Sequence, residues 1–287
     1  MGFGRNSQTK TDIQSLFRKA SDIENTKKSM ILFGKSGAGK TVAITGGKFR
    51  KLDSLGKHID VEISSFPLPM VVFDIDKGSL DGIKTWDKTT QEQFIIFEPT
   101  QVDEILMGLE SIAQHNKNLS NDEEGLFDFD EIETILIDGV HHVWTSLTAN
   151  MSLIKAKQSN IDLVKSMSSA KLKNIDKVTP EGTEFIPANT VWKKFTELLR
   201  ENKKYSNIVC TAGMELNTWG KNTTTKFLGH NNQEADYDIW GTSEAIETRI
   251  QNGGTTKEYF FNAIRVRGGT SGVKIEDFCF NKLNELY

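Results

Sequence analysis

Gly34-Lys35-Ser36-Gly37-Ala38-Gly39-Lys40-Thr41 fits the phosphate-loop pattern G-x-x-x-x-G-K-[ST] at every fixed position. The apolar residues 29–33 before it predict a buried strand, and residues 41–45 after it can open a helix. In that context the glycines bring backbone N–H groups against phosphates, Lys40 reaches the β- and γ-phosphates, and the Thr41 hydroxyl binds Mg²⁺. These eight residues therefore predict a nucleoside triphosphate site, and the alternative is a chance glycine-rich turn.

Composition narrows the class of protein. The 287 residues are 26% charged and 37% apolar, with a formal net charge of −4, which is typical of a globular α/β protein of one large or two small domains. Two cysteines give neither a disulfide framework nor metal-ligand spacing. No apolar run approaches a membrane span and no signal peptide follows Met1, so we expect a soluble, cytoplasmic protein with no membrane partner.

Apolar runs alternate with helical patterns along most of the chain. This alternation predicts an α/β fold with a mostly parallel central sheet flanked by helices and with nucleotide at the carboxyl ends of the strands. A late pair of strands predicts an antiparallel C-terminal extension. We expect an N-terminal arm and helix over 1–29 and one nucleotide-binding domain over 30–287. The predicted strands are 70–73, 94–97, 134–138, 207–212, 259–267 and 273–280, and the predicted helices are 11–23, 102–114, 145–177 and 190–204.

Thr134-Ile135-Leu136-Ile137-Asp138 is typical of a Walker B strand, whose aspartate holds Mg²⁺. The alternative is a strand that merely ends at an acidic turn. AAA+ proteins place a glutamate directly after this aspartate to polarise water, but here Gly139 follows it. Asp76, after the second predicted strand, is the best-placed base; Asp74 and the seven acids within 120–133 are the other candidates.

From these motifs the chain resembles the RecA-like ATPases, and more narrowly those that phages encode for single-strand annealing and recombination. The matching elements are Asp74-Ile75-Asp76, Lys77-Gly78-Ser79-Leu80-Asp81, Phe97-Glu98-Pro99-Thr100 and Ile137-Asp138-Gly139-Val140. The resemblance covers about residues 30–280 and implies a RecA-like P-loop NTPase core. It also implies an Mg²⁺-dependent ATPase in which Asp76 orients the attacking water, and the cytoplasm of a host cell if a phage encodes it.

Arg265 and Arg267 follow a late strand two residues apart. RecA proteins carry two basic residues at this spacing that reach a neighbouring subunit's γ-phosphate, so the resemblance implies a homo-oligomer with shared ATP sites. Arginines two apart lie on the same face of a strand and suit transferring phosphoryl charge. The alternative is a solvated edge strand.

Two segments lie where RecA-like proteins place their DNA loops. Residues 145–177 are lysine-rich, and residues 217–237 predict a polar loop. We therefore expect these segments to bind the backbone of single-stranded DNA and to stack on its bases. RecA proteins end the fifth strand with a nucleotide-sensing glutamine, which is missing here; Thr211 and Glu215 are candidate substitutes. The open alternative is an oligomeric assembly or switch ATPase that acts on a protein partner. A small-molecule kinase has the same phosphate loop, but it would want an arginine-rich lid, and the arginine-poor middle of the chain argues against one.

Overall fold

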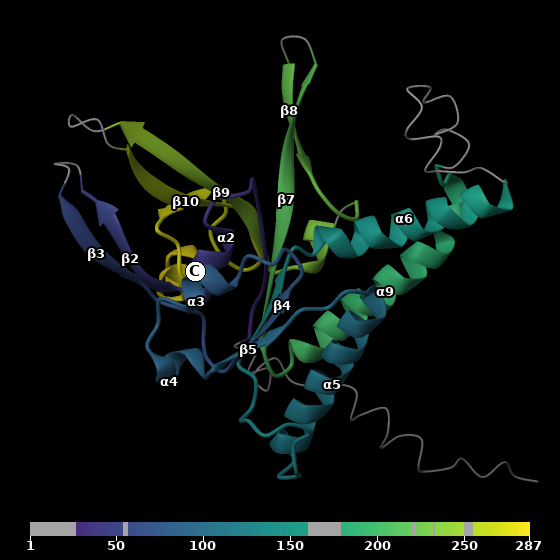
Figure 1. The fold of residues 1–287 in the computed structure, drawn as a ribbon, viewed down its shortest axis with the longest axis horizontal. Helices are drawn as coiled ribbons and strands as arrows, with labels where there is room; N and C mark the ends of the chain where they lie inside the picture. Colours follow the sequence, from purple (N-terminus) through teal and green to yellow (C-terminus); the bar gives the residue numbers. More distant parts are fainter. Residues whose placement is uncertain (1–26, 54–56, 160–178, 220–221, 232, 250–254) are drawn as a thin grey trace, which may run out of the picture.

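The computed structural model describes residues 27–53, 57–159, 179–219, 222–231, 233–249 and 255–287. Its centre is a mixed sheet with the order β11-β10-β9-β1-β7-β6-β4-β5, to which β8 is added through β7 (Figure 1). From β9 to β5 every pairing in this path is parallel. The predicted α/β class with a mostly parallel sheet is therefore confirmed. The strands of the parallel part are β1 (Ser29–Gly34), β4 (Met70–Asp74), β5 (Phe94–Phe97), β6 (Thr134–Asp138), β7 (Asn207–Trp219) and β9 (Ile239–Arg249).

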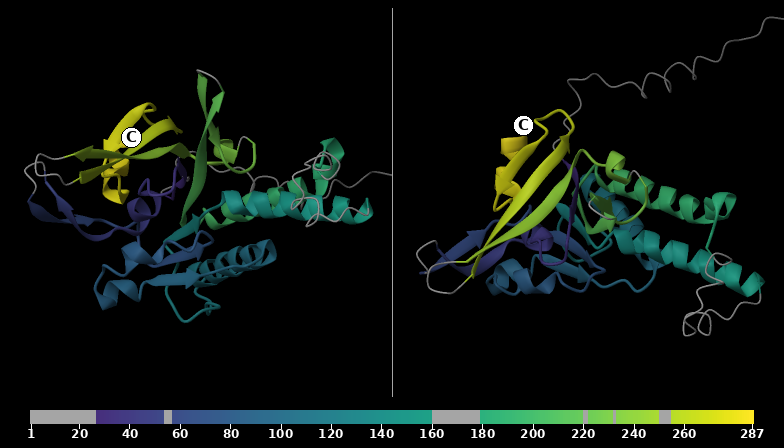
Figure 2. Two further views of the ribbon diagram at one scale, coloured as in Figure 1. Left: turned by 45° about the horizontal axis from the view of Figure 1, so that its top comes forward. Right: turned by 90° about the horizontal axis from the view of Figure 1, so that it is seen from above.

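The central strands are buried on both faces, which explains why they read as continuous apolar runs rather than alternating ones. Alternate side chains supply two separate cores. Ile31 and Phe33 belong to one core, in which the sheet packs against three long helices: α5 (Val102–Ser120), α6 (His141–Gln158) and α9 (Ile186–Asn202). Met30 and Leu32 belong to the other, under short elements: α2 (Lys40–Thr45), α3 (Leu80–Ile83) and η5 (Phe280–Leu286). Figure 2 shows the long helices gathered on one side of the sheet.

The antiparallel extension is also confirmed. β10 (Thr255–Val266) pairs antiparallel with β9 and with β11 (Val273–Glu276). The prediction missed β9, which is the second parallel neighbour of the phosphate-loop strand. Its sequence, IWGTSEAIETR, alternates between buried and less buried residues at its start and is not a continuous apolar run, so it lacks the signal that revealed the other parallel strands.

Two segments for which no strand was predicted form hairpins. The polar stretch after α2 forms β2 (Gly47–Leu52) and β3 (His58–Ile63), which pair antiparallel. Residues 217–237 were predicted as a loop, but β7 continues to Trp219 and pairs with β8 (Asn222–Phe227), with residues 220–221 not described. We call β7 from Met214 onward together with β8 the β7–β8 hairpin; it stands away from the rest of the sheet in Figure 1. A polar strand of threonines has no apolar alternation, which is why its pattern resembled a loop.

The remaining elements are short or extend a prediction. They are α4 (Lys88–Gln91), η3 (Gly182–Phe185) and η4 (Gln233–Asp236). Helix α5 runs beyond the predicted 114, and α9 begins at Ile186, four residues before the predicted start. Only the part of the lysine-rich segment up to 159 can be compared, and it lies in α6 and its C-cap; residues 160–178 and the predicted helix 11–23 lie outside the described residues. No described helix is both long and apolar enough to span a membrane.

Candidate functional site

The strand register aligns the carboxyl ends of four parallel strands. Gly34 of β1 pairs with Gly213 of β7, and Asp138 of β6 lies between Asp74 of β4 and Thr211 of β7. Ligands of open α/β sheets bind at this edge, where strand order departs from chain order. A cavity of about 720 Å³ opens there, lined by the whole phosphate loop together with Asp76, Asp138, His141, Gly213 and Tyr259 among others. Its volume is within the range of small-molecule sites.

The phosphate loop has the backbone that its glycines predicted. Gly37 and Gly39 have φ values of 75° and 77°, a region that favours glycine. A Cβ added to Gly39 would lie 2.6 Å from the Tyr259 ring, and one added to Gly34 would lie 2.7 Å from the carbonyl oxygen of Ser243. The loop therefore packs closely against β9 and β10, while Lys35, Ser36 and Gly37 stay exposed. This leaves the rim of the loop open to a ligand.

Lys40 begins α2 at the base of the loop. Its Nζ donates to the carbonyl oxygens of Gly34 and Lys35, both at 3.1 Å. Burial lowers the pKa of Lys40, and the carboxylates of Asp138 and Asp76 oppose that lowering. A largely buried ammonium with two carboxylates near it is placed to meet further negative charge in the cavity.

Asp138 is 2% exposed and accepts hydrogen bonds from three hydroxyls. Thr41 Oγ1 donates to its Oδ2 at 2.9 Å, Ser79 Oγ donates to the same oxygen at 3.0 Å, and Thr211 Oγ1 donates to its Oδ1. Burial raises the pKa of Asp138, while the three hydroxyl donors oppose the rise. The Thr41 hydroxyl and the Asp138 carboxylate place two hard oxygen ligands side by side at the cavity. Mg²⁺ prefers such ligands, so these residues fit Mg²⁺.

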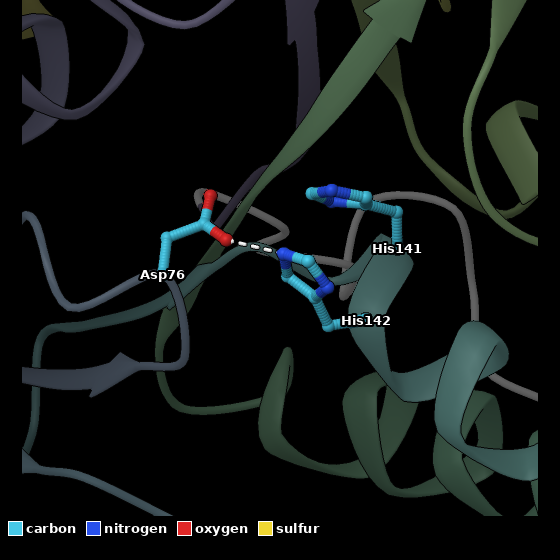
Figure 3. A group of neighbouring side chains, drawn as sticks. All are labelled: Asp76, His141 and His142. Atoms are coloured by element: carbon cyan, nitrogen blue, oxygen red, sulfur yellow. Dashed lines mark ion pairs between the residues drawn. The ribbon is translucent and has the colours of Figure 1, made fainter. Parts of the chain in front are cut away.

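Asp76 lies beside Gly139, at the position where a side chain of residue 139 would be. A Cβ added to Gly139 would approach Asp76 Oδ1 to 2.6 Å, and Gly139 has a φ of 93°. Asp76 Oδ1 also lies 2.6 Å from His142 Nε2 (Figure 3). The glycine after the Walker B-like aspartate thus makes room for a carboxylate from the neighbouring strand's end.

The other candidate bases lie elsewhere. Asp74 is 1% exposed, and its Oδ1 accepts the N–H groups of Gly78 and Ser79 at 3.0 and 3.4 Å, so it orders the loop after β4. The acids of 120–133 precede β6 and therefore lie toward the amino-terminal edge of the sheet. Asp76 is the candidate that the structure brings to the cavity with Lys40 and Asp138.

Arg265 and Arg267 are not brought to the cavity of their own chain. β10 runs antiparallel to β9, so Val266 pairs with Ile239, which itself pairs with Met30 near the beginning of β1. Both arginines are exposed on either side of the buried Val266. Arg267 donates to the Ala235 carbonyl at 3.2 Å and lies 3.8 Å from Asp238. Any contact of these arginines with a phosphate loop needs a second subunit.

Four participants were not assigned from the sequence. Ser79 and Tyr259 were not singled out, and His141 and His142 begin α6 directly after Val140. Asp76, His141 and His142 each offer one ligand atom within 4.8 Å of the others. Two adjacent imidazoles one turn after a Walker B-like strand were a usable signal. Of the two candidate substitutes for the missing glutamine, Thr211 lies in the site, whereas Glu215 is exposed on the β7–β8 hairpin.

No family model matches this chain, and no curated protein sequence is significantly similar to it.

Proposed function

We propose that the protein is a RecA-like, Mg²⁺-dependent ATPase. The observation that carries the proposal is the convergence of Lys40, Thr41, Asp138 and Asp76 on the cavity beside the phosphate loop. Each has a separate task in phosphoryl transfer, and a chance glycine-rich turn would not gather Asp138 and Asp76 around its own Lys40 and Thr41. The absence of an [NT]KxD guanine signature favours ATP over GTP.

Binding comes from the loop and its lysine. The backbone N–H groups of the loop and of the first residues of α2 provide a positive concavity for phosphate oxygens. Lys40 exchanges its two carbonyl acceptors for phosphate oxygens, and the ammonium offsets charge that builds up during transfer. Thr41 and Asp138 would hold Mg²⁺, which would neutralise negative charge on the phosphates.

Hydrolysis requires a water aligned with the terminal phosphate. Asp76 is solvent-accessible and faces the same cavity as Lys40, so its carboxylate can accept a hydrogen bond and then the proton from that water. His142 fixes the orientation of the carboxylate through the 2.6 Å contact. Gly139 keeps the space open for this arrangement.

The RecA-like assignment adds an assembly. Arg265 and Arg267 lie exposed at the edge opposite the phosphate loop, which supports a head-to-tail arrangement in which one subunit's arginines meet the next subunit's nucleotide. Arginine is well matched to a transferring phosphoryl group. Such a site is complete only between two copies of this chain.

The partner of this assembly is proposed to be single-stranded DNA, in recombination or annealing. The supporting observation is that the β7–β8 hairpin projects from the sheet and begins directly after Gly213, which lines the cavity. A protein partner that binds the same hairpin is the second candidate function. The mild net charge of −4 favours the protein partner, because DNA would need a local basic surface.

One experiment tests both the proposed ATP hydrolysis and the proposed DNA partner. Phosphate release from ATP is measured with Mg²⁺ or with EDTA, with and without single-stranded DNA, over a range of protein concentrations, with Lys40→Ala as the negative control. Mg²⁺-dependent release that rises with DNA and with protein concentration supports the whole proposal. Release that ignores DNA points to the protein-partner candidate, and release equal to that of Lys40→Ala overturns the ATPase itself.

A further inference from the structure

His141 connects the nucleotide cavity to the β7–β8 hairpin. It is 9% exposed and is the first residue of α6, and it also lines the cavity of the phosphate loop. Its Nδ1 accepts the backbone N–H of Gly213 at 3.2 Å. Figure 3 shows its imidazole on the same side of α6 as that of His142, both directed toward Asp76. One rigid ring thus contacts both the site and β7.

Gly213 is the residue at which β7 changes partners. It is the last residue of β7 in register with β1, and the pairing with β8 begins at the next residue, Met214. Its carbonyl accepts the N–H of Leu228 at 3.0 Å, which closes the hairpin. A Cβ added there would lie 2.7 Å from Leu228 and 3.1 Å from His141 Nε2. Because packing around Gly213 is close, a shift of the His141 ring would displace the hairpin.

The hydrogen bond with Gly213 decides what His141 can offer the cavity. Because Nδ1 accepts, the neutral ring carries its proton on Nε2 and is a donor there. Burial first, and the neighbouring His142 second, lower the pKa of His141 to about 4, so the ring is neutral near pH 7. A donor on Nε2 suits a phosphate oxygen. It does not suit a metal ion, although a ring nitrogen of His141 lies within 4.8 Å of the potential ligand atoms of Asp76 and His142.

We propose that His141 is a nucleotide-contact residue whose Nε2–H donates to a terminal phosphate oxygen, and that its bond to Gly213 transmits the presence of that phosphate to the β7–β8 hairpin. This inference rests on the proposed ATP site. A ligand shifts an equilibrium only through contacts that differ between two states. ADP leaves the Nε2–H without its phosphate partner, so the hairpin differs between the two nucleotide states. His141 then senses the terminal phosphate in place of the glutamine that β7 lacks.

Two substitutions at His141 separate the effect of its contact with the phosphate from the effect of its contact with Gly213. His141→Asn retains an acceptor near Nδ1 for the Gly213 N–H but does not reach the phosphate, whereas His141→Ala loses both contacts. His58→Asn, on the exposed strand β3, is the matched control because His58 lies outside the cavity lining. Thermal melts of all variants establish that they are folded, and His141→Asn remains informative if His141→Ala does not fold.

The full chain is examined by amide hydrogen exchange with a non-hydrolysable ATP analogue, with ADP and without nucleotide. In the wild type we expect exchange of amides 213–219 and 222–228 to differ between analogue and ADP. In both His141 variants that difference is lost, and affinity for the analogue falls about tenfold while affinity for ADP stays within about threefold.

The outcomes separate this inference from the proposed function. An unchanged difference between analogue and ADP in folded His141→Asn overturns the role of His141 while leaving the ATP site intact. Wild-type protein that binds the analogue no better than Lys40→Ala overturns the ATP site, and the inference with it. Stoichiometric Zn²⁺ binding that needs both His141 and Asp76 would assign the cluster to a metal instead.

Discussion

The carboxyl-terminal edge of the sheet and its amino-terminal edge both hold charged side chains, but in opposite surroundings. At the carboxyl-terminal edge Lys40, Asp76 and Asp138 line an open cavity of about 720 Å³. At the amino-terminal edge Asp238 accepts the N–H of Ser29 at 2.9 Å and its hydroxyl at 3.0 Å, with Lys203 at 2.5 Å. The first set faces a space that a ligand can fill, and the second is closed on itself.

The difference separates charges that remain available to a ligand from charges that only hold the fold. A charge whose partners are all within the chain contributes to stability, whereas groups held around a cavity retain capacity for a ligand. Arg267, near Asp238, belongs partly to the closed set. The substitutions below test this division in order of decreasing effect.

Lys40→Ala is expected to have the largest effect, a loss of ATP turnover of about 10³-fold, because it removes the ammonium at the phosphates. Phosphate release and binding of a fluorescent ATP analogue measure it. Lys88→Ala, at the exposed start of α4, is the control and should retain wild-type turnover. Equal turnover in the two variants would contradict the assignment of the cavity.

Asp76→Asn is expected to lower turnover by about 10²-fold while ATP binding persists, because the amide cannot accept the proton from water. Its oxygen can still keep the contact with His142 Nε2, so the geometry of the site is retained. Single-turnover hydrolysis and equilibrium binding separate the two effects. Turnover at the wild-type rate would remove Asp76 as the base.

Gly139→Ala probes the space beside Asp76. The added Cβ would lie 2.6 Å from Asp76 Oδ1 and would occupy a φ of 93°, so the carboxylate must move. A displacement of this order lowers turnover by roughly 10- to 100-fold. Gly78→Ala is a sharp control because it lines the same cavity but has nothing within 4 Å of its added Cβ. Similar losses in both variants would show that crowding of Asp76 is not the cause.

Much of the carboxyl-terminal edge could be predicted from the sequence. Continuous apolar runs identified β1, β4, β5 and β6, and parallel strands end at one edge, so motifs that follow strands had to meet there. This is why Asp76 and Asp138, 62 positions apart in the numbering, were expected beside the phosphate loop.

The amino-terminal edge could not be predicted in this way. Its contacts depend on β9, which lacks a strong pattern, and on the antiparallel turn that brings Arg267 back to Asp238. The β7–β8 hairpin was mistaken for a loop because polar threonine strands resemble loops in composition. The contact of His141 with Gly213 joins residues 72 apart, and no local spacing indicates it.

Mixing variants tests whether the amino-terminal edge serves a neighbour's site. Arg265→Ala and Asp76→Asn should each be slow alone, but an equimolar mixture should recover up to about a quarter of wild-type turnover, since random pairing gives that share of intact shared sites. The same mixture made with Arg267→Ala shows whether the arginine near Asp238 also takes part. No recovery at any ratio would count against a shared site.

Asp238→Asn should have the smallest effect on turnover but a measurable one on stability. Burial pushes the pKa of Asp238 upward, but its bonds from Lys203 and Ser29 outweigh burial, and the pKa lies below its ordinary 3.8. A carboxyl with a depressed pKa stabilises the fold above its ordinary pKa, and this stabilisation is lost as pH falls through the lowered value. Urea unfolding at pH 7 should show the variant about 2 kcal/mol less stable. The gap should remain down to about pH 4 and narrow only below it; a gap that narrows between pH 7 and 5 would mean that another group carries the stabilisation.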